Sequence, residues 1–196
     1  MRSRDRAPPQ LQDVRPPLNN VVMRSIFIDE SKSKGFLLCA VEVDSNEVPE
    51  LRRAISSLRL KGQSDIHFVS ESPRRKREIL SRLSGFGLRV LFISGYGAKE
   101  TVLRRASLEK FVSQLLPRTN YQVWLDLDES HLTLDKKTIS LALASNGLSE
   151  FVTFTHSKTR QQPLLLLPDA LAWARTRGGE WNHRIESLGE LRSSSL

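Results

Sequence analysis

Three aspartates stand where predicted strands or helices end or begin, and their type and placement suit metal binding. Asp29 ends one predicted strand, Asp126 closes another, and Asp169 opens a predicted helix after the apolar run 164–167. A carboxylate beside apolar residues is costly to desolvate unless it is paired or binds a cation. Three such acids in a chain of net charge +8 predict a magnesium site that faces a polyanion.

The strand pattern predicts how two of these acids meet. Side chains alternate across a strand, so Asp29 and Asp126 lie side by side if their strands are neighbours. Directly opposed like charges destabilise a sheet, and a counter-ion would then be required. Two-metal nucleases place two ions about 4 Å apart between carboxylates from separate elements. We therefore predict that Asp29, Asp126 and Asp169 bind Mg²⁺ or Mn²⁺, which prefer oxygen ligands.

Each acid also has a purely structural interpretation. Asp169 suits a helix cap, Asp29 suits a hairpin turn, and Asp126 suits an exposed strand end. Asp128 and Asp135 are alternative acids nearby. Asp128 shares the predicted face of Asp126 and replaces it if the strand runs two residues longer, whereas Asp135 is also a predicted helix N-cap.

The basic residues are concentrated in one segment. Residues 51–82 contain nine lysines and arginines against three acidic residues, which is most of the net charge of +8. Such a cluster indicates contact with nucleic acid, RNA or DNA, and its alternative is a solvated helix surface. For His67 the alternatives are a proton shuttle and a hydrogen-bonded structural residue. The residues predicted to bind nucleic acid are Lys61, His67, Arg74, Arg75, Lys76 and Arg77.

Hydrophobic periodicity predicts alternating strands and helices. The predicted strands are 21–29, 35–43, 88–94, 121–127 and 150–155, and the predicted helices are 47–60, one capped by Ser72, 98–116, 135–146 and 168–177. This order predicts an α/β fold whose mixed sheet has antiparallel first strands and parallel later strands, flanked by helices. A helical pair is expected as an insertion after the second strand.

The remaining composition bounds the organisation of the chain. Proline-rich residues 1–20 predict a disordered N-terminal tail, 21–190 a single domain, and 191–196 a flexible C-terminus. No apolar run approaches the roughly 20 residues that cross a bilayer, so no membrane partner is expected. A single cysteine, Cys39, excludes an intrachain disulfide and fits the reducing cytoplasm.

Four short motifs together resemble the family called domain of unknown function 3800. They are Phe-Ile-Asp-Glu-Ser at 27–31, Ile-His-Phe at 66–68, the late Asp126, and Leu-Pro-Asp-Ala-Leu-Ala at 167–172. The resemblance spans about residues 22–186 and implies a ribonuclease H-like fold. It also implies that Asp29, Asp126 and Asp169 are the metal ligands and that Glu30 is an auxiliary acid.

The chain departs from that family pattern at two places. Lys32 stands where the family usually has a glycine, and the helix 98–116 offers only Glu100 and Glu109 where ribonuclease H supplies a catalytic glutamate. Three functions follow as hypotheses. The first is a magnesium-dependent nuclease that hydrolyses phosphodiester bonds, with Asp29, Asp126, Asp169 and Glu30 as catalytic residues. The second is a catalytically silent nucleic-acid-binding or protein-interaction module on the same fold. In the third, the basic helix contacts only a protein partner.

Overall fold

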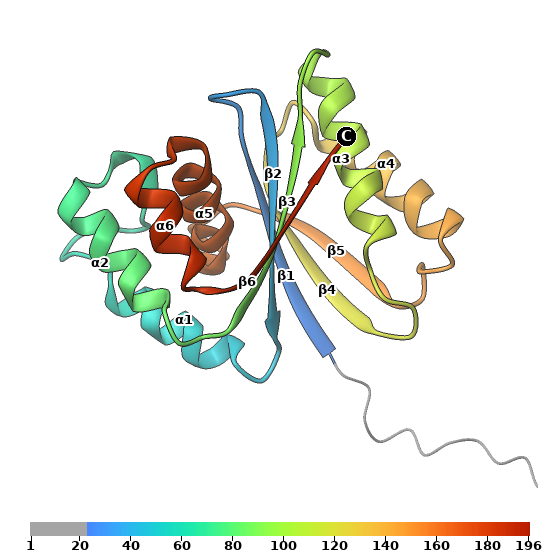
Figure 1. Ribbon diagram of the computed structural model, residues 1–196. Coiled ribbons are helices and arrows are strands. Elements are labelled where there is room, and N and C mark those ends of the chain that lie inside the picture. Colours follow the sequence, from blue (N-terminus) through green and yellow to red (C-terminus); the bar gives the residue numbers. More distant parts are fainter. Residues whose placement is uncertain (1–22) are drawn as a thin grey trace, which may run out of the picture.

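A six-stranded mixed sheet with helices on both faces organises residues 23–196, which a computed structural model describes (Figure 1). The predicted N-terminal tail, residues 1–20, lies outside the described residues. The strands are β1 (Met23–Ser31), β2 (Phe36–Asp44), β3 (Leu88–Gly95), β4 (Asn120–Asp126), β5 (Val152–Ser157) and β6 (Gly189–Ser195). The α-helices are α1 (Val48–Ser57), α2 (Pro73–Leu83), α3 (Glu100–Ser113), α4 (Leu132–Ser145), α5 (Leu166–Arg177) and α6 (Glu180–Glu186). Two short 3₁₀ turns are η1 (Phe68–Ser70) and η2 (Pro163–Leu165).

The strand order is β5-β4-β1-β2-β3-β6. β2 pairs antiparallel with β1 and β3, whereas β4 pairs parallel with β1, β5 with β4, and β6 with β3. The prediction of an α/β fold with antiparallel first strands and parallel later strands is confirmed. All strands except β2 therefore run in one direction. Their carboxyl ends lie together along one border of the sheet, which crosses the strands and differs from the edge strands β5 and β6.

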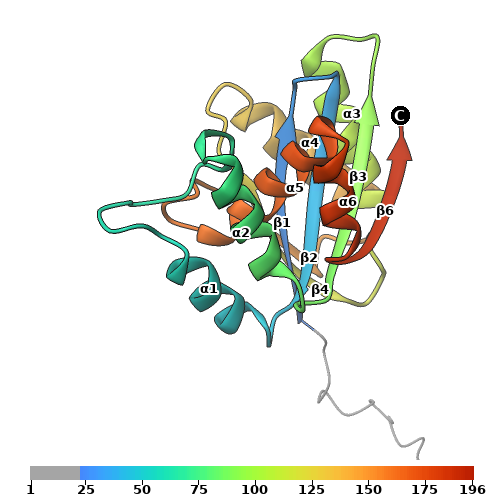
Figure 2. The ribbon, with the colours of Figure 1, turned by 60° about the vertical axis from the view of Figure 1, so that its left-hand side comes forward.

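The alternation of side chains along β1 divides the interior into two cores. Phe27 is buried beneath α1, α2, α5 and α6, and its neighbour Ile28 is buried beneath α3 and α4. Figure 1 shows these helix groups on opposite sides of the sheet, and Figure 2 shows α5 against β1 and β2. The same alternation sends Asp29 to the face of Phe27 and Glu30 to the face of Ile28.

The two helices between β2 and β3 lie where the sequence places a helical pair. Ser72 is the N-cap of α2, as predicted, because its hydroxyl accepts a hydrogen bond from the Arg75 backbone N–H at 3.3 Å. The predicted N-cap of α4 was wrong. This helix begins at Leu132, and Asp135 lies inside it, where its carboxylate pairs with Arg104 of α3.

The predicted flexible C-terminus, residues 191–196, was also wrong. Gly189–Ser195 forms β6 at the edge of the sheet, so the predicted domain end at residue 190 falls inside a strand. Leu191 packs against the core beneath α5 and α6, and the Arg175 side chain donates to the Ser193 hydroxyl at 3.2 Å. The serine-rich composition conceals these contacts from a sequence reading.

A helix must be both long and apolar to cross a bilayer. None of the helices within residues 23–196 is both long enough and apolar enough to cross a membrane.

Substitution of Gly189 tests the pairing of β6 with β3. Its φ is +151°, and a Cβ there would lie 2.0 Å from the Leu88 carbonyl oxygen, whereas Gly97, with φ +75°, has open space around it. We expect Gly189→Ala to lower the free energy of unfolding by about 3 kcal/mol and Gly97→Ala by only about 1 kcal/mol. Urea unfolding measures both values. Equal losses in the two variants would contradict the pairing of β6 with β3.

Candidate metal and nucleic-acid site

Asp29 and Asp126 meet because β1 and β4 are parallel neighbours. Their register pairs Ile28 with Leu125, so the next residue on each strand is one of the two aspartates. Phe27 and Trp124, two residues earlier, contact the core beneath α5. Both carboxylates therefore lie on the α5 side of the sheet, at the edge where the parallel strands end.

Asp169 reaches the same edge from the first turn of α5. This helix packs across β1 and β2, and its N-terminal turn lies beside the 3₁₀ turn η1. The Asp169 carboxylate accepts a hydrogen bond from the Phe68 backbone N–H at 3.3 Å. β1, the end of β4 and the first turn of α5 thus supply one acid each at the same end of the sheet, hereafter the Asp29–Asp126–Asp169 cluster. Their carboxylate oxygens do not all lie within 4.8 Å of one another, whereas ligand atoms of Glu100, Asp128 and His131, among the described residues, do.

The electrostatics show that the three acids are close to one another. Burial and then the charges of Glu30, Asp169 and Asp126 raise the pKa of Asp29 well above its usual value. Burial and the charge of Glu30 raise the pKa of Asp126. Burial raises the pKa of Asp169, and the charge of Asp126 adds to this shift, although the Phe68 N–H opposes it. The folded chain therefore resists holding all three groups ionised.

Nearby cations compensate this negative charge only from a distance. His67 and Lys76 lower the pKa of Asp169, and Arg104 lowers that of Asp126, but each contribution is smaller than the effect of burial. Within residues 23–196, none of the three aspartates forms an ion pair with a lysine, arginine or histidine. Half-buried carboxylates in this state have the chemistry of a site for a hard divalent cation.

Glu30 belongs to the other face of the sheet. Its carboxylate lies 2.6 Å from a guanidinium nitrogen of Arg104 and 3.5 Å from the Lys32 ammonium. Its charge still raises the pKa values of Asp29 and Asp126. Glu30, predicted as an auxiliary acid, is thus next to the cluster, but its own carboxylate is engaged by two cations.

Asp135 is not available as an alternative ligand, and its prediction in that role was wrong. It is fully buried, and its two carboxylate oxygens each accept a 2.8 Å hydrogen bond from Arg104. His156 Nε2 lies 3.2 Å from the same carboxylate. Burial tends to raise the pKa of Asp135, but the bonds from Arg104 and His156 outweigh it and lower the pKa.

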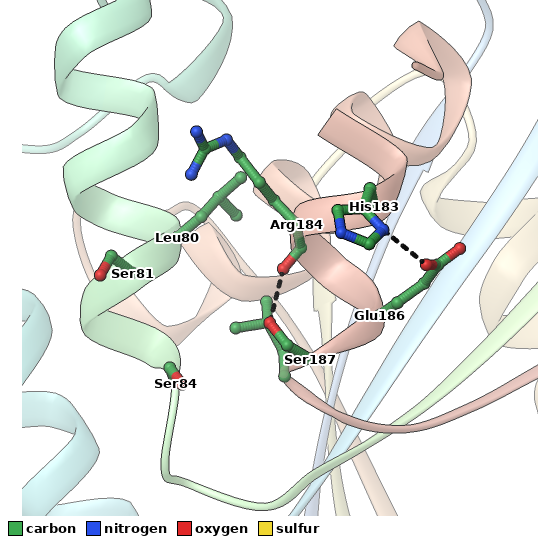
Figure 3. Close-up of a pocket in the computed structure, with 8 residues that line it drawn as sticks. Leu80, Ser81, Ser84, His183, Arg184, Glu186 and Ser187 are labelled. Atoms are coloured by element: carbon green, nitrogen blue, oxygen red, sulfur yellow. Dashed lines mark hydrogen bonds and ion pairs between the residues drawn. The ribbon is translucent and has the colours of Figure 1, made fainter. Parts of the chain in front are cut away.

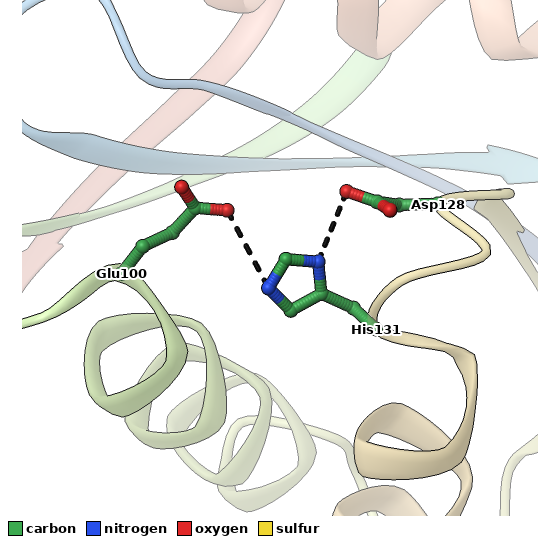
Figure 4. A group of neighbouring side chains, drawn as sticks. All are labelled: Glu100, Asp128 and His131. Atoms are coloured by element: carbon green, nitrogen blue, oxygen red, sulfur yellow. Dashed lines mark hydrogen bonds and ion pairs between the residues drawn. The ribbon is translucent and has the colours of Figure 1, made fainter.

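Asp128 also lies outside the cluster, because β4 ends at Asp126 and does not run two residues longer. Its carboxylate accepts bonds from Ser130 and lies 3.0 Å from His131 Nδ1, and these contacts hold its pKa well below the usual value. Figure 4 shows the His131 ring between Asp128 and Glu100. These three side chains are close enough to share an ion, but the Lys32 ammonium is already 2.7 Å from Glu100 and 3.5 Å from Asp128.

Of the six residues predicted to bind nucleic acid, four reach solvent and two, Lys76 and Arg75, are engaged within the chain. Lys61, His67 and Arg74 are exposed, and Arg77 is half-exposed in an ion pair with Glu180 at 2.9 Å. Lys76 is buried, donates to the Val69 carbonyl at 2.8 Å, and lies 4.8 Å from the Trp173 ring centre.

Lys76 and Arg75 therefore have contacts that stabilise the fold. The Lys76 ammonium also donates to the Glu71 carbonyl, and burial lowers its pKa. The Arg75 guanidinium donates to the Leu58 carbonyl at the end of α1 and pairs with Glu71 and Glu78. Both cations are thus engaged within the chain, and their contact with nucleic acid stays a prediction.

A separate hollow lies between α2 and α6, at the opposite edge of the sheet from the cluster. Figure 3 shows Ser81 and Ser84 on one side of it and His183, Arg184 and Glu186 on the other. His183 pairs with Glu186 at 3.2 Å, and its side chain is almost fully exposed. Nothing in this solvated pair has the burial or the charge imbalance that marks the aspartate cluster.

No model of a known protein family matches this chain. A search of curated proteins found no match either. The resemblance to the domain of unknown function 3800 family therefore stays a prediction, based on the four motifs.

The sequence reading missed the cations of the buried network. Arg104 pairs with Glu30 and Asp135, and His156 with Asp135, yet only the acids were considered as functional residues. One signal was present for Arg104: it lies four residues before Leu108 and seven before Phe111, on the apolar stripe of α3. A charged residue on such a stripe indicates a buried ion pair.

Removing the partner of Arg104 tests this buried network. We expect Asp135→Asn to lower the free energy of unfolding by about 3 kcal/mol, because it leaves a buried guanidinium without its bidentate carboxylate. Denaturant unfolding measures the loss. Glu109→Gln, which breaks the exposed 2.9 Å pair with Arg105 on the same helix, should cost less than about 0.5 kcal/mol. A similar small cost for Asp135→Asn would contradict the buried pairing.

The raised pKa of Asp29 predicts that replacing this acid stabilises the fold, whereas replacing Asp135 destabilises it. Because the folded chain holds this proton more tightly than the unfolded chain, ionised Asp29 destabilises the fold at pH 7. This destabilisation is lost as the pH falls toward the unfolded pKa of about 3.9. With a chelator present, Asp29→Asn should therefore melt a few degrees higher than the wild type at pH 7, and the difference should shrink on acidification.

Asp128→Asn is the control for that measurement. The pKa of Asp128 is lowered, so its charged form stabilises the fold at neutral pH, and this stabilisation is lost as the pH falls through the folded pKa. The variant should melt slightly lower than the wild type at pH 7. If Asp29→Asn also melts lower, the aspartates do not repel one another in the folded chain.

Proposed function

We propose that this chain is a divalent-metal-dependent nuclease that hydrolyses phosphodiester bonds of RNA or DNA. Asp29, Asp126 and Asp169 are its metal ligands. One observation carries the proposal: three carboxylates from β1, β4 and α5 lie at one end of the sheet, half-buried, with pKa values raised first by burial and then by the charges of nearby acids. Perturbed acids of this kind concentrate at functional sites.

The arrangement of strands supports the ribonuclease H-like fold as part of this proposal. That fold has three antiparallel strands followed by parallel strands beside the first, and the order β5-β4-β1-β2-β3 has this pattern. β6 extends the sheet beyond β3, and α1 and α2 are proposed to be the insertion after the second strand. Membership of the domain of unknown function 3800 family is proposed on the same grounds.

The donor set fits magnesium or manganese. Three carboxylates supply hard oxygen ligands, and they come from three elements whose positions the sheet and α5 fix. Such an ion lowers the pKa of a bound water and neutralises charge on the phosphate. The chain itself contributes position: the β1–β4 register places two ligands side by side, and the Phe68 N–H orients Asp169.

The second candidate is a nucleic-acid-binding or protein-interaction module without catalysis. One observation favours it: Glu30, the fourth acid at the edge, is paired with Arg104 and Lys32 and is turned to the opposite face. Lys61 and Arg74 remain exposed for a polyanion in either case. In this candidate, binding would fall steeply with salt and would not depend on a divalent ion.

Single substitutions in the cluster separate the two candidates. With Mg²⁺ or Mn²⁺ and labelled single-stranded and duplex RNA and DNA, we expect Asp29→Asn, Asp126→Asn and Asp169→Asn each to lower cleavage by at least about 100-fold, or about 2.7 kcal/mol. Loss of one ligand removes the charge that holds the ion. The ion should also raise the melting temperature of the wild type and not that of Asp29→Asn.

The matched control is Asp128→Asn, an acid at the same sheet edge that is held by Ser130 and His131. This variant should keep cleavage and the ion-dependent rise in melting temperature. Cleavage that survives Asp29→Asn, or a wild type that neither cleaves nor gains stability with either ion, would count against the nuclease. Salt-sensitive binding without cleavage would then support the second candidate.

A further inference from the structure

An open hollow leads away from the Asp29–Asp126–Asp169 cluster along α5. It has a volume of about 630 Å³, and its walls are the β1–β2 turn, residues 31–34, and one side of α5. Of the three aspartates, Asp169 alone lines it, so the hollow borders the candidate metal site at this residue. We call it the α5 groove.

One wall of the α5 groove is a single stripe of the helix. Asp169, Trp173 and Arg177 follow one another at intervals of four residues, and all three line the groove. Residues at this spacing share a helix face, and a rise of 1.5 Å per residue puts Arg177 about 12 Å along the axis from Asp169. The stripe therefore runs from an acid at the sheet edge to a cation in the last turn of α5.

The opposite wall contributes hydroxyl groups and a second exposed cation. The Ser31 hydroxyl lies 3.4 Å from both the Ser33 hydroxyl and the Thr176 hydroxyl of α5, which ties the turn to the helix. Lys34 is exposed on this wall, as Arg177 is on the other. Lys32 differs from both, because Glu100, Glu30 and Asp128 surround its ammonium.

Aromatic and apolar side chains lie between the two ends. Trp173 is half-buried and packs edge-on against Phe68 at 5.4 Å and Trp181 at 5.1 Å between ring centres, so its position is fixed. Val69 lines the groove beside it and is 63% exposed. The Lys76 ammonium lies 4.8 Å from the Trp173 ring centre and covers one face of the ring. Cations that follow a backbone, with an aromatic side chain beside them, are features of sites for single-stranded nucleic acid.

We propose that the α5 groove binds the backbone of one single-stranded segment of the substrate, with Lys34 and Arg177 on phosphates next to the one at the metal site. This inference rests on the proposed nuclease function and names its substrate form. The groove has the volume of a pocket for a drug-sized ligand, roughly 300–1,000 Å³, which suits one or two nucleotides. Asp169 and Arg177, about 12 Å apart along the helix axis, suit a ligand with more than one phosphate.

Binding measured without cleavage tests the groove directly. The wild type, in EDTA, is titrated against a fluorescent single-stranded oligonucleotide and its duplex, and anisotropy is recorded at several salt concentrations. We expect the single strand to bind more tightly. The double variant Lys34→Ala and Arg177→Ala should weaken that binding at least tenfold, and its log–log salt slope should be shallower by about 1.4, as expected for two lost phosphate contacts.

The matched control is the double variant Arg53→Ala and Arg82→Ala. It removes the same charge from two exposed arginines that line another hollow, on α1 and α2. Equal weakening in both double variants would overturn the inference, as would tighter binding of the duplex. Both variants should melt like the wild type, because all four side chains are exposed.

The outcomes for the groove and for the nuclease are distinguishable. If Lys34 and Arg177 control single-strand binding but no metal supports cleavage, the groove stands and the nuclease falls. If cleavage depends on Asp29 while binding ignores Lys34 and Arg177, the nuclease stands and the groove is overturned.

Discussion

The apolar cores on the two faces of the sheet hold together carboxylates that repel one another. The parallel register of β1 and β4 brings Asp29 beside Asp126, and α5 adds Asp169, although like charges side by side weaken a sheet. The arrangement persists because apolar cores on both faces fix the elements independently of the acids. Phe27 and Ile28, immediately before Asp29, are both almost fully buried, one in each core.

The two faces of the sheet differ in how the charge of their acidic side chains is compensated. On the α3–α4 face, Arg104 satisfies Asp135 and Glu30, and Lys32 lies among Glu30, Glu100 and Asp128. On the α5 face, the nearest cations act on the aspartates only at a distance. The period of two along β1 creates this difference, because it separates Asp29 from Glu30. One face is therefore compensated by cations of the chain, whereas on the other burial and like charges raise the pKa values of the aspartates.

Sequence periodicity predicted the fold better than it predicted the partners of individual polar groups. The strand that ends at Asp126 and the capping of α2 by Ser72 follow from local patterns, because burial and capping act over a few residues. The first strand was predicted to end at Asp29, but β1 continues to Ser31. β6 was missed because its serines carry no apolar alternation. The contacts of Lys76 and Asp135 were missed. Lys76 donates to the nearby Val69 and Glu71 carbonyls and lies over the distant Trp173 ring, and Asp135 pairs with Arg104, 31 residues away in the sequence. Which charges are buried together depends on tertiary packing.

The α5 helix shows why the acid cluster is unlike an ordinary set of surface charges. Its buried side, with Leu167, Ala170 and Leu171, fixes it on the sheet, and its first turn places Asp169 near the positive end of the helix dipole. Those partial charges offset part of the repulsion but leave the pKa of Asp169 raised. An uncharged side chain at any of the three positions would relieve the fold. Local conflicts of this kind are expected at functional or strained sites, and we propose divalent-ion binding as the function of these carboxylates.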